Sequence, residues 1–480
     1  MKRVAFHNLG CKVNSYELDI MRQKMEEHGY TSVPFEEEAE VYVINTCTVT
    51  NIADRKSRQM IHKAKKRNPG ALVIAVGCYV ETDKARVGTD SAIDLAIGNN
   101  NKARIAELLD EFLSQNEAED TAADSLMKRT LSGKTLADLT RRPSYEDMQL
   151  RKPGHTRAYV KIQDGCNQFC TYCIIPYARG RIRSRRPGEI LREVQVLSEG
   201  GIREVILTGI HVSSYGLEWD TDSDAVPFDP VKSGAILLDL MDRIRQIPGI
   251  ERIRLSSLEP RIITEPFVQG IAAMPEVCPH FHLSLQSGCN ATLRRMNRHY
   301  TAEEFMGSVE LLRRYYDKPA ITTDVIVGFP GESIAEFEET KHFLEAVNFY
   351  EMHVFKYSVR KGTAAASMPV QIPEPVKGAR SDILLEMTAK QSKDFRARFV
   401  GRQEELLLEE KAQMPFGLCW RGHTKRYVEG YIPCEGGFDA RMEEGQLVSG
   451  VFTTMAEGAE GLMFAPDIEL DGKTVYHKRM

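Results

Sequence analysis

The sequence predicts an α/β protein in three parts: an N-terminal open parallel α/β domain, a central partial (βα)6 barrel and a C-terminal small antiparallel β-barrel. Two observations lead to this prediction. Short apolar runs alternate with polar, helix-favouring segments over most of the chain, which is typical of parallel sheets covered by helices. After about residue 395 the pattern changes to short alternating strands separated by turn residues, which is typical of a small barrel.

Length and composition bound the class of protein. The chain has 480 residues, too many for one ordinary core, with 42% hydrophobic and 27% charged residues. Its apolar runs fall short of a membrane span, and its first residues lack the apolar stretch of a secretory signal, so we expect a cytoplasmic protein with no membrane partner. The net charge of −5 excludes a globally basic nucleic-acid binder, so any RNA contact must rest on local patches.

The first domain is expected over residues 1–112, where strand candidates at 4–10, 41–46 and 72–77 alternate with polar segments. Residues 113–150 are polar and charged, with little to bury, and are predicted to form a linker.

The barrel is expected over residues 151–390 and the small C-terminal barrel over 395–465. Capping-box patterns open two of the barrel helices, at Thr301 with Glu304 and at Ser333 with Glu336. Six βα units leave a barrel open on one side. Its strand candidates are residues 157–163, 203–209, 252–258, 281–286, 322–328 and 352–358.

The strongest chemical signal is the spacing CxxxCxxC at Cys166, Cys170 and Cys173, directly after the first barrel strand. Three thiolates on one short loop can reach three corners of a cubane iron–sulfur cluster, which leaves one iron open to a substrate-like ligand. A zinc knuckle is the alternative, but zinc motifs usually come as two matched pairs of ligands.

A second group of cysteines shares a structural position. Cys11, Cys47 and Cys78 each follow one of the predicted N-terminal strands. Because the carboxyl ends of parallel strands meet at one edge of a sheet, the three thiols should converge in space. We therefore predict a second three-cysteine cluster, with three unrelated core thiols as the alternative.

These motifs carry a resemblance to a known family. LGCKVN, VINTCTVT, AVGCY, GCNQFCTYCIIPYARGRIRSR, LTGIH and DVIVGFPGE occur in order along nearly the whole chain, which resembles the radical S-adenosylmethionine (SAM) methylthiotransferases. HNLGCKVNSYE and NTCTVTNIADRKSRQ resemble the branch acting on N6-threonylcarbamoyladenosine in tRNA. The resemblance implies an N-terminal methylthiotransferase domain, a radical-SAM core and a TRAM-like RNA-binding domain at the C-terminal end.

The resemblance also implies cofactors, partners and a reaction. Two [4Fe–4S] clusters and SAM are the expected cofactors, with Cys166, Cys170 and Cys173 holding the radical-generating cluster. The first three cysteines would hold the auxiliary, sulfur-supplying cluster. The expected reaction converts threonylcarbamoyladenosine at position 37, beside the anticodon, to its 2-methylthio derivative. Expected partners are the tRNA anticodon stem-loop, a reductant such as flavodoxin or ferredoxin, and a sulfur donor. No side chain is assigned a catalytic role.

Candidate SAM contacts lie at the carboxyl ends of the barrel strands, where such barrels place their ligands. Glu259 could accept from a ribose hydroxyl or from the methionine ammonium, and a structural hydrogen bond is the alternative for each polar candidate. For the segment GFPGE (328–332) the alternative is a simple tight turn. The candidates are Thr208, Gly209, His211, Ser257, Glu259, Gln286 and Gly328.

Two basic segments, the arginine-rich run 179–186 and residues 54–67, flank the predicted cluster loops and are expected to contact phosphates; solvated faces are the alternative. Two other functions remain open. The same chemistry could act on isopentenyladenosine in tRNA or on a ribosomal protein. A two-cluster electron carrier is the alternative from a different class.

Overall fold

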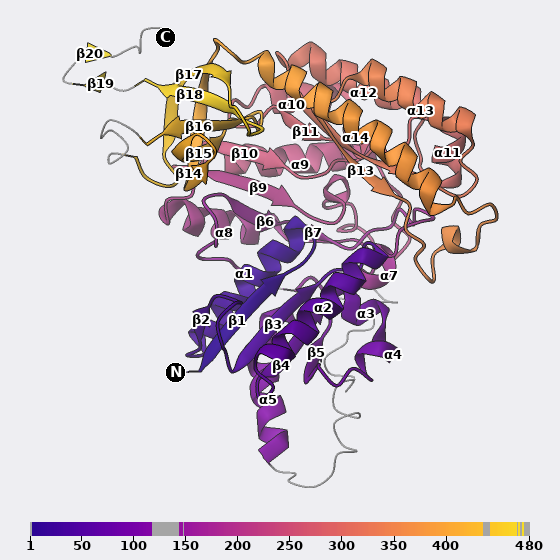
Figure 1. The fold of residues 1–480 in the computed structure, drawn as a ribbon, viewed down its shortest axis with the longest axis vertical. Coiled ribbons are helices and arrows are strands. Elements are labelled where there is room, and N and C mark those ends of the chain that lie inside the picture. The colour runs from indigo at the N-terminus through magenta and orange to yellow at the C-terminus, as the bar shows by residue number, and fades with distance from the viewer. Residues whose placement is uncertain are drawn as a thin grey trace.

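The computed structural model has three parts, coloured in chain order in Figure 1, with the N-terminal part below the central part and the C-terminal barrel beside the upper end of the central part. The predicted linker 113–150 lies mostly outside the residues that the structure describes, and its first part belongs to helix α5 (Ile105–Glu117). The described residues are 2–117, 144–146, 148–434, 442–467, 469–470 and 473–474.

The N-terminal part is built on a five-stranded parallel sheet in the order β2-β1-β3-β4-β5. Its three long strands are those that the sequence predicted, and the short β2 and β5 at the edges were missed because each has only three residues. The strands are β1 (Arg3–Asn8), β2 (Thr31–Val33), β3 (Val41–Thr46), β4 (Leu72–Gly77) and β5 (Leu95–Ile97).

Helices cover both faces of this sheet because successive strand residues point to opposite sides. On one face, Val41 and Val43 pack with residues of α1 (Lys12–Glu27) and α5. On the other, Tyr42 and Ile44 pack with residues of α2 (Asn51–Arg67) and α3 (Cys78–Thr82). The short α4 (Lys84–Val87) follows.

The central part has two three-stranded parallel sheets, β10-β9-β6 and β11-β12-β13. Isolated parallel bridges such as Leu258 to Leu283 join them, and β6 and β13 at the two ends do not pair. The result is the predicted partial barrel, open on one side. Its strands are β6 (Ala158–Lys161), β9 (Glu204–Thr208), β10 (Arg252–Leu255), β11 (His280–His282), β12 (Ala320–Val327) and β13 (Glu351–Lys356).

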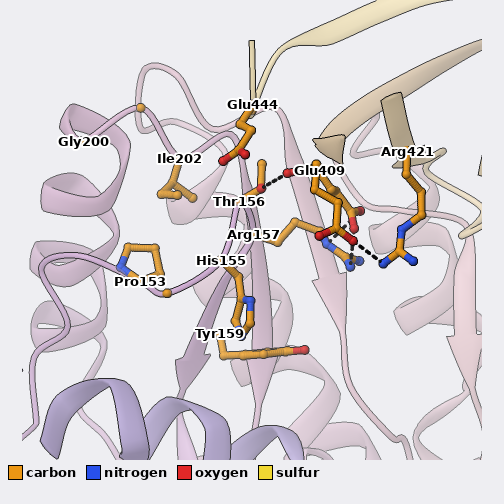
Figure 2. Close-up of a pocket in the computed structure, with 14 residues that line it drawn as sticks. Pro153, His155, Thr156, Arg157, Tyr159, Gly200, Ile202, Glu409, Arg421 and Glu444 are labelled. Atoms are coloured by element: carbon orange, nitrogen blue, oxygen red, sulfur yellow. Dashed lines mark hydrogen bonds and ion pairs between the residues drawn. The ribbon is translucent and has the colours of Figure 1, made fainter. Parts of the chain in front are cut away.

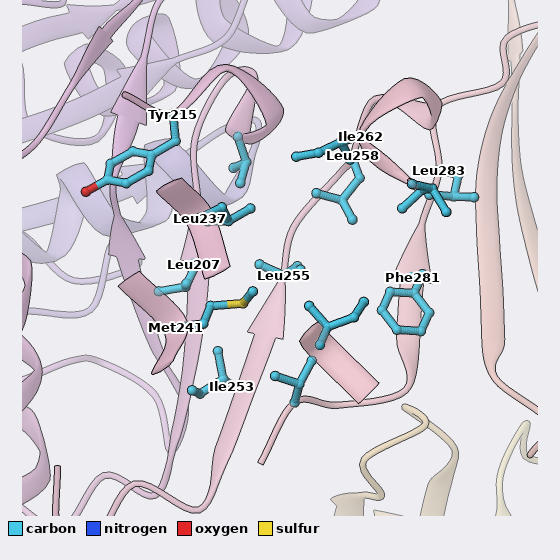
Figure 3. Close-up of a cluster of buried hydrophobic side chains, with 14 of the residues drawn as sticks. Leu207, Tyr215, Leu237, Met241, Ile253, Leu255, Leu258, Ile262, Phe281 and Leu283 are labelled. Carbon is cyan, nitrogen blue, oxygen red and sulfur yellow. The ribbon is translucent and has the colours of Figure 1, made fainter. Parts of the chain in front are cut away.

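Helices surround this barrel, and Figure 3 shows part of the buried core between them, with Leu207, Leu237 and Leu255 among its side chains. Both predicted capping boxes are present, at the starts of α12 and α13. The helices are α8 (Pro187–Glu199), α9 (Pro230–Ile244), α10 (Glu265–Ala272), α11 (Asn290–Arg295), α12 (Ala302–Tyr315), α13 (Ile334–Val347) and α14 (Glu374–Ala397).

The C-terminal part is a closed five-stranded barrel in the order β14-β15-β16-β18-β17. Its pairs are antiparallel as expected, except that β16 and β18 pair in parallel. The strands are β14 (Gln403–Met414), β15 (Gly417–His423), β16 (Glu429–Pro433), β17 (Leu447–Met455) and β18 (Leu462–Pro466), and a short hairpin, β19 (Glu469–Leu470) with β20 (Lys473–Thr474), follows. No helix in the described part of the chain is both long and apolar enough to cross a membrane.

Candidate functional site

The N-terminal cysteines meet at one edge of the parallel sheet. Cys11 caps α1 just after β1, Cys47 follows β3, and Cys78 begins α3 directly after β4. A Cβ on Gly10, which has a φ of +112°, would lie 3.1 Å from the Cys47 sulfur, so glycine lets the two loops approach. Burial, together with the neighbouring thiols of Cys78 and Cys11, raises the pKa of Cys47 to about 12. The mutual effect shows that the three thiols face one another.

The central cysteines lie on the loop between β7 (Gln163–Asp164) and α7 (Ile175–Arg179). Burial and the thiol of Cys170 raise the pKa of Cys173 to about 12. Tyr172, inside this loop, packs edge-on against Phe329 of the GFPGE turn, with ring centroids 6.4 Å apart. The GFPGE segment therefore supports the cysteine loop.

Neither cysteine group has the geometry of a single zinc ion. Zinc–thiolate bonds of about 2.3 Å hold sulfurs roughly 4 Å apart. Within the described residues, only His282, Asp324 and His353 form a trio whose ligand atoms all lie within 4.8 Å of one another. The thiols of each group are therefore spaced more widely than one zinc ion requires, and the prediction of iron–sulfur clusters is retained.

Arg298, which the sequence analysis missed, connects the central cysteines to the predicted SAM pocket. Its guanidinium donates to the Cys170 sulfur at 3.3 Å and to Glu259 at 3.4 Å. Burial alone would raise the pKa of Glu259, but the hydrogen bond from His211 and the charges of Arg298 and Arg261 lower it below its ordinary value. Glu259 is therefore a buried carboxylate anion beside the cysteine loop, where it can accept from a cation or hydroxyl.

The other predicted SAM contacts differ in their surroundings. His211 is held by Ser214 and Glu259, at 2.7 and 3.5 Å. Gly328 donates its N–H to Glu332 at 2.7 Å and packs against Lys377 of α14, as a tight turn would. Thr208 is buried at the end of β9, and Gly209 lies against Gln163. Ser257 is exposed, and the backbone of Gln286 is left-handed, with a φ of +74°.

A buried ion-pair network joins α1 to the loop of the central cysteines. Arg179 donates to both carboxylate oxygens of Glu17, at 2.8 and 3.0 Å. Lys161 lies 2.7 Å from the same carboxylate, and Lys102 completes the set. Figure 1 shows α1 between the N-terminal sheet and the barrel. This network fixes the position of Cys11 relative to the central loop.

The expectation that the whole arginine run contacts phosphates is wrong. Arg179 and Arg183 pair with Asp164, at 3.2 and 3.1 Å, and Arg185 pairs with Glu193 at 2.5 Å. These three arginines are buried because their guanidinium groups pair with buried carboxylates. Only Arg181 and Arg186 of the run remain accessible.

The same network provides a test of whether an anionic cluster suits the N-terminal cysteines. Four buried cations surround only two carboxylates, those of Glu17 and Asp164. The Nε of Arg179 has no hydrogen-bond partner within the described residues, and the Cys78 thiol is among the groups that raise the pKa of Arg179 against the effect of burial. A buried excess of positive charge requires anions. Thiolates bound to iron would supply them, so these residues fit a cluster.

A second contact holds the N-terminal part across the open side of the barrel. Arg360, just beyond β13, donates to Asp54 at 2.7 Å and to Thr48, the neighbour of Cys47, at 2.6 Å. Because Glu17 is fixed on the β6 side, the N-terminal part closes the gap that the barrel leaves. The side chain of Asn99, which contacts the Cys78 sulfur, donates to the carbonyl of Ala178 in α7 at 2.8 Å, so the two cysteine groups lie on adjoining parts of the molecule.

Lys12, which follows Cys11, is affected by charged groups of the barrel. Burial and the charges of Arg254 and Arg157 lower its pKa to about 8, whereas Asp324 raises it. These groups come from β10, from just before β6, and from β12.

The predicted basic helix is α2, and Arg55, Lys56, Lys63 and Lys66 are exposed on it. A cavity of about 700 Å³, shown in Figure 2, lies elsewhere, between the residues before β6 and the C-terminal barrel. Arg157, Glu409 and Arg421 line it, and no cysteine does. It sits at the amino end of β6, whereas the cysteines follow the carboxyl end, so we assign the chemistry to the cysteines.

Comparison with known proteins agrees with this site. Residues 160–344 match the Radical SAM superfamily, and residues 3–98 match the uncharacterized protein family UPF0004. The threonylcarbamoyladenosine tRNA methylthiotransferase MtaB of Bacillus subtilis (strain 168) is 38% identical over 85% of this chain and 85% of its own. The tRNA-2-methylthio-N(6)-dimethylallyladenosine synthase of Moorella thermoacetica is 34% identical over 87% of this chain and 90% of its own.

A solved structure supports the fold. The radical SAM methyltransferase TsrM from Kitasatospora setae, with cobalamin and a [4Fe-4S] cluster bound, gives a TM-score of 0.51 at 15% identity and covers 76% of this chain and 74% of its own. The expected cofactors, SAM and two [4Fe–4S] clusters, are confirmed by the family. With the two cysteine groups and the curated relatives in agreement, the chain belongs to the radical SAM methylthiotransferases.

Proposed function

We propose that this enzyme converts N6-threonylcarbamoyladenosine at position 37 of tRNA to its 2-methylthio derivative. The observation that carries the reaction is the contact between the two parts that bear the cysteine groups, where Arg179, just after the central loop, donates to Glu17 of α1. A radical and a sulfur source must reach the same carbon, and the contact between the two parts supports a reaction in which both act on one substrate. The substrate itself is inferred from relatives such as that of Bacillus subtilis, named for it at 38% identity.

We assign the ligands by group: Cys166, Cys170 and Cys173 hold the SAM-cleaving cluster, and Cys11, Cys47 and Cys78 hold the auxiliary one. When bound, these cofactors supply the electron, the 5′-deoxyadenosyl radical and the sulfur. The side chains orient and shield them. Arg298 holds Cys170 and Glu259 in fixed relation, and the Glu259 carboxylate is placed to accept from the SAM ammonium or ribose. Thr208, Gly209, His211, Ser257, Gln286 and Gly328 complete the proposed SAM pocket.

For the RNA backbone we propose the exposed lysines and arginines of α2 together with the accessible Arg181 and Arg186. Position 37 lies in a single-stranded loop, where aromatic side chains can stack on unpaired bases. Tyr177 is exposed, and its ring lies edge-on to that of Phe169, with centroids 5.9 Å apart. The Arg181 guanidinium lies over the Phe169 ring, so these side chains together provide such a surface. The C-terminal barrel is proposed as an additional RNA-binding part. A flavodoxin- or ferredoxin-like reductant and a sulfur donor complete the reaction, in the cytoplasm.

The test uses anaerobically reconstituted enzyme with SAM and reductant. It is offered anticodon stem-loops carrying threonylcarbamoyladenosine or isopentenyladenosine, and separately a ribosomal-protein substrate. Mass analysis of nucleosides and peptides should show a methylthio product only on the threonylcarbamoyl stem-loop. Exclusive activity on isopentenyladenosine or on protein would overturn the substrate and leave the radical chemistry standing.

A further inference from the structure

Two histidines and an aspartate from neighbouring strands of the barrel converge. Asp324 of β12 is paired with His353 of β13 in the strand register, and His282 lies on the adjoining β11. Each of the three side chains offers an imidazole nitrogen or a carboxylate oxygen, and these atoms all lie within 4.8 Å of one another. The proposed cluster and SAM sites use none of the three.

The trio faces the interior of the barrel. Successive residues of a strand point to opposite faces of the sheet. Val325 and Met352, the neighbours of Asp324 and His353, are buried in the core shared with the surrounding helices. Asp324 and His353 therefore point the other way. Asp324 is partly exposed and His353 is exposed, so an ion can reach both.

The positions of His282 and Asp324 fit two ligands of one ion. The His282 Nε2 lies 3.3 Å from the Asp324 carboxylate. Ligand atoms about 2.0–2.2 Å from one tetrahedral ion lie roughly 3.3–3.5 Å apart. The Nδ1 of the same ring is 3.0 Å from the Thr322 hydroxyl, a contact of the kind that orients metal-binding histidines. When Nδ1–H donates to Thr322, the Nε2 lone pair faces the carboxylate, and a cation between them stabilises both.

His353 supplies the third ligand and is not held by another group. Its ring stacks on that of His282 with centroids 5.8 Å apart, and it makes no hydrogen bond or ion pair within the described residues. His423, by contrast, pairs with Glu409 at 2.8 Å. An exposed imidazole without a partner can rotate by the small distance that closes the trio on an ion.

We infer that His282, Asp324 and His353 form a binding site for a divalent first-row transition-metal ion, separate from the two iron–sulfur clusters. Two imidazoles and one carboxylate are a donor set that suits zinc and non-haem iron, and three protein ligands leave positions open for oxygen ligands such as water. The site adjoins the proposed SAM pocket, because the N–H of Gln286 donates to the Asp324 carbonyl at 2.8 Å.

The test uses anaerobically reconstituted enzyme whose iron content shows that both clusters are in place. Mn²⁺ is the first probe, because it favours oxygen and nitrogen ligands over thiolates. Its EPR signal can be read beside oxidised [4Fe–4S] clusters, which are diamagnetic. Wild type should bind one Mn²⁺ per chain, and pulsed EPR should show couplings from imidazole nitrogen.

The variants assign the ligands. His353→Ala and Asp324→Asn should each weaken Mn²⁺ binding by at least about 10-fold. Thr322→Val should weaken it by about 10- to 100-fold, because the ring of His282 loses its orienting contact. His342→Ala, which removes an exposed histidine of α13, is the control and should leave binding unchanged.

Zn²⁺ is the second probe, since it binds such sites more tightly than Mn²⁺. It should displace Mn²⁺ from wild type and stay with the holoenzyme through gel filtration only when His353 is present. If neither ion binds wild type more tightly than His353→Ala at equal iron content, the inference is wrong and the trio is an ion pair beside a stacked ring. Equal binding by wild type and Asp324→Asn would also overturn it. Because no RNA takes part, the result is independent of the proposed substrate.

Discussion

The two cysteine groups are brought together by different means. The central group occupies residues 166–173 of a single loop, so its spacing is a property of the local chain. The N-terminal group comes from the ends of three strands, β1, β3 and β4, and exists only once the sheet has formed. Local spacing needs only a correct loop, whereas the second group needs the register of a whole sheet. The first is therefore expected to tolerate distant changes better than the second.

The largest effect should come from removing the central group. Replacing Cys166, Cys170 and Cys173 together by alanine should remove about half of the iron and abolish SAM cleavage, because we propose that these thiolates hold the cluster that reduces the sulfonium. Iron analysis and the yield of 5′-deoxyadenosine measure both effects. Cys434→Ala, outside both groups, is the control and should keep full cleavage; cleavage retained in the triple variant would refute the assignment.

Removing Cys11, Cys47 and Cys78 should separate the two groups functionally. SAM cleavage should persist, because these residues belong to another sheet. Methylthio product should fall below detection, because the proposed sulfur source would be missing. Product analysis by mass, beside the 5′-deoxyadenosine yield of the same sample, provides the measurement. A triple variant that still forms methylthio product would show that this group plays no part in sulfur transfer.

The contact between the groups can be weakened without touching a cysteine. Glu17→Gln leaves Arg179, Lys161 and Lys102 without their shared carboxylate and should lower the free energy of unfolding by about 3–5 kcal/mol. The exposed Glu26→Gln on the same helix should cost little. Urea unfolding of the two variants measures the difference, and equal stabilities would show that the network does not support the fold.

The carboxylate of Glu17 also predicts that the stability of the protein depends on pH in the acid range. Burial would raise the pKa of Glu17, but Arg179, Lys102 and Lys161 lower it well below its usual 4.5. An acid with a lowered folded-state pKa stabilises the protein above about pH 4.5, and this contribution is lost as the pH falls through the folded-state value. Glu17→Gln should therefore flatten the loss of stability below pH 4.5, which unfolding at a series of pH values measures.

The smallest effects should come from the surface arginines. Arg186→Gln should weaken RNA binding a few-fold and reduce the salt slope by about one, because a lost phosphate contact releases fewer counterions. Arg181→Gln should act similarly. Arg192→Gln, exposed on α8, is the matched control. Titrations at several salt concentrations measure the slope, and an unchanged slope in both variants would move the RNA path away from this loop.

The sequence by itself determined the strand order along the chain, the capping boxes at Thr301 and Ser333, and both cysteine groups. These features depend on the spacing of residues along the chain and on the rule that the carboxyl ends of parallel strands share one edge of the sheet. Both can be read from the sequence without knowing which distant segments pack together. It also showed a run of five arginines, but their separation into three buried and two accessible side chains could not be read from it.

Only the tertiary structure decided which charges meet. Arg179 finds Glu17 across 162 positions of sequence, Arg298 finds Cys170 across 128, and Arg360 finds Thr48 across 312. Charge type and spacing are local properties, whereas burial and pairing depend on which distant surfaces pack together. The sequence around an arginine in a basic run does not reveal whether the side chain meets a phosphate or a buried carboxylate. The fold supplies the partner that stabilises it.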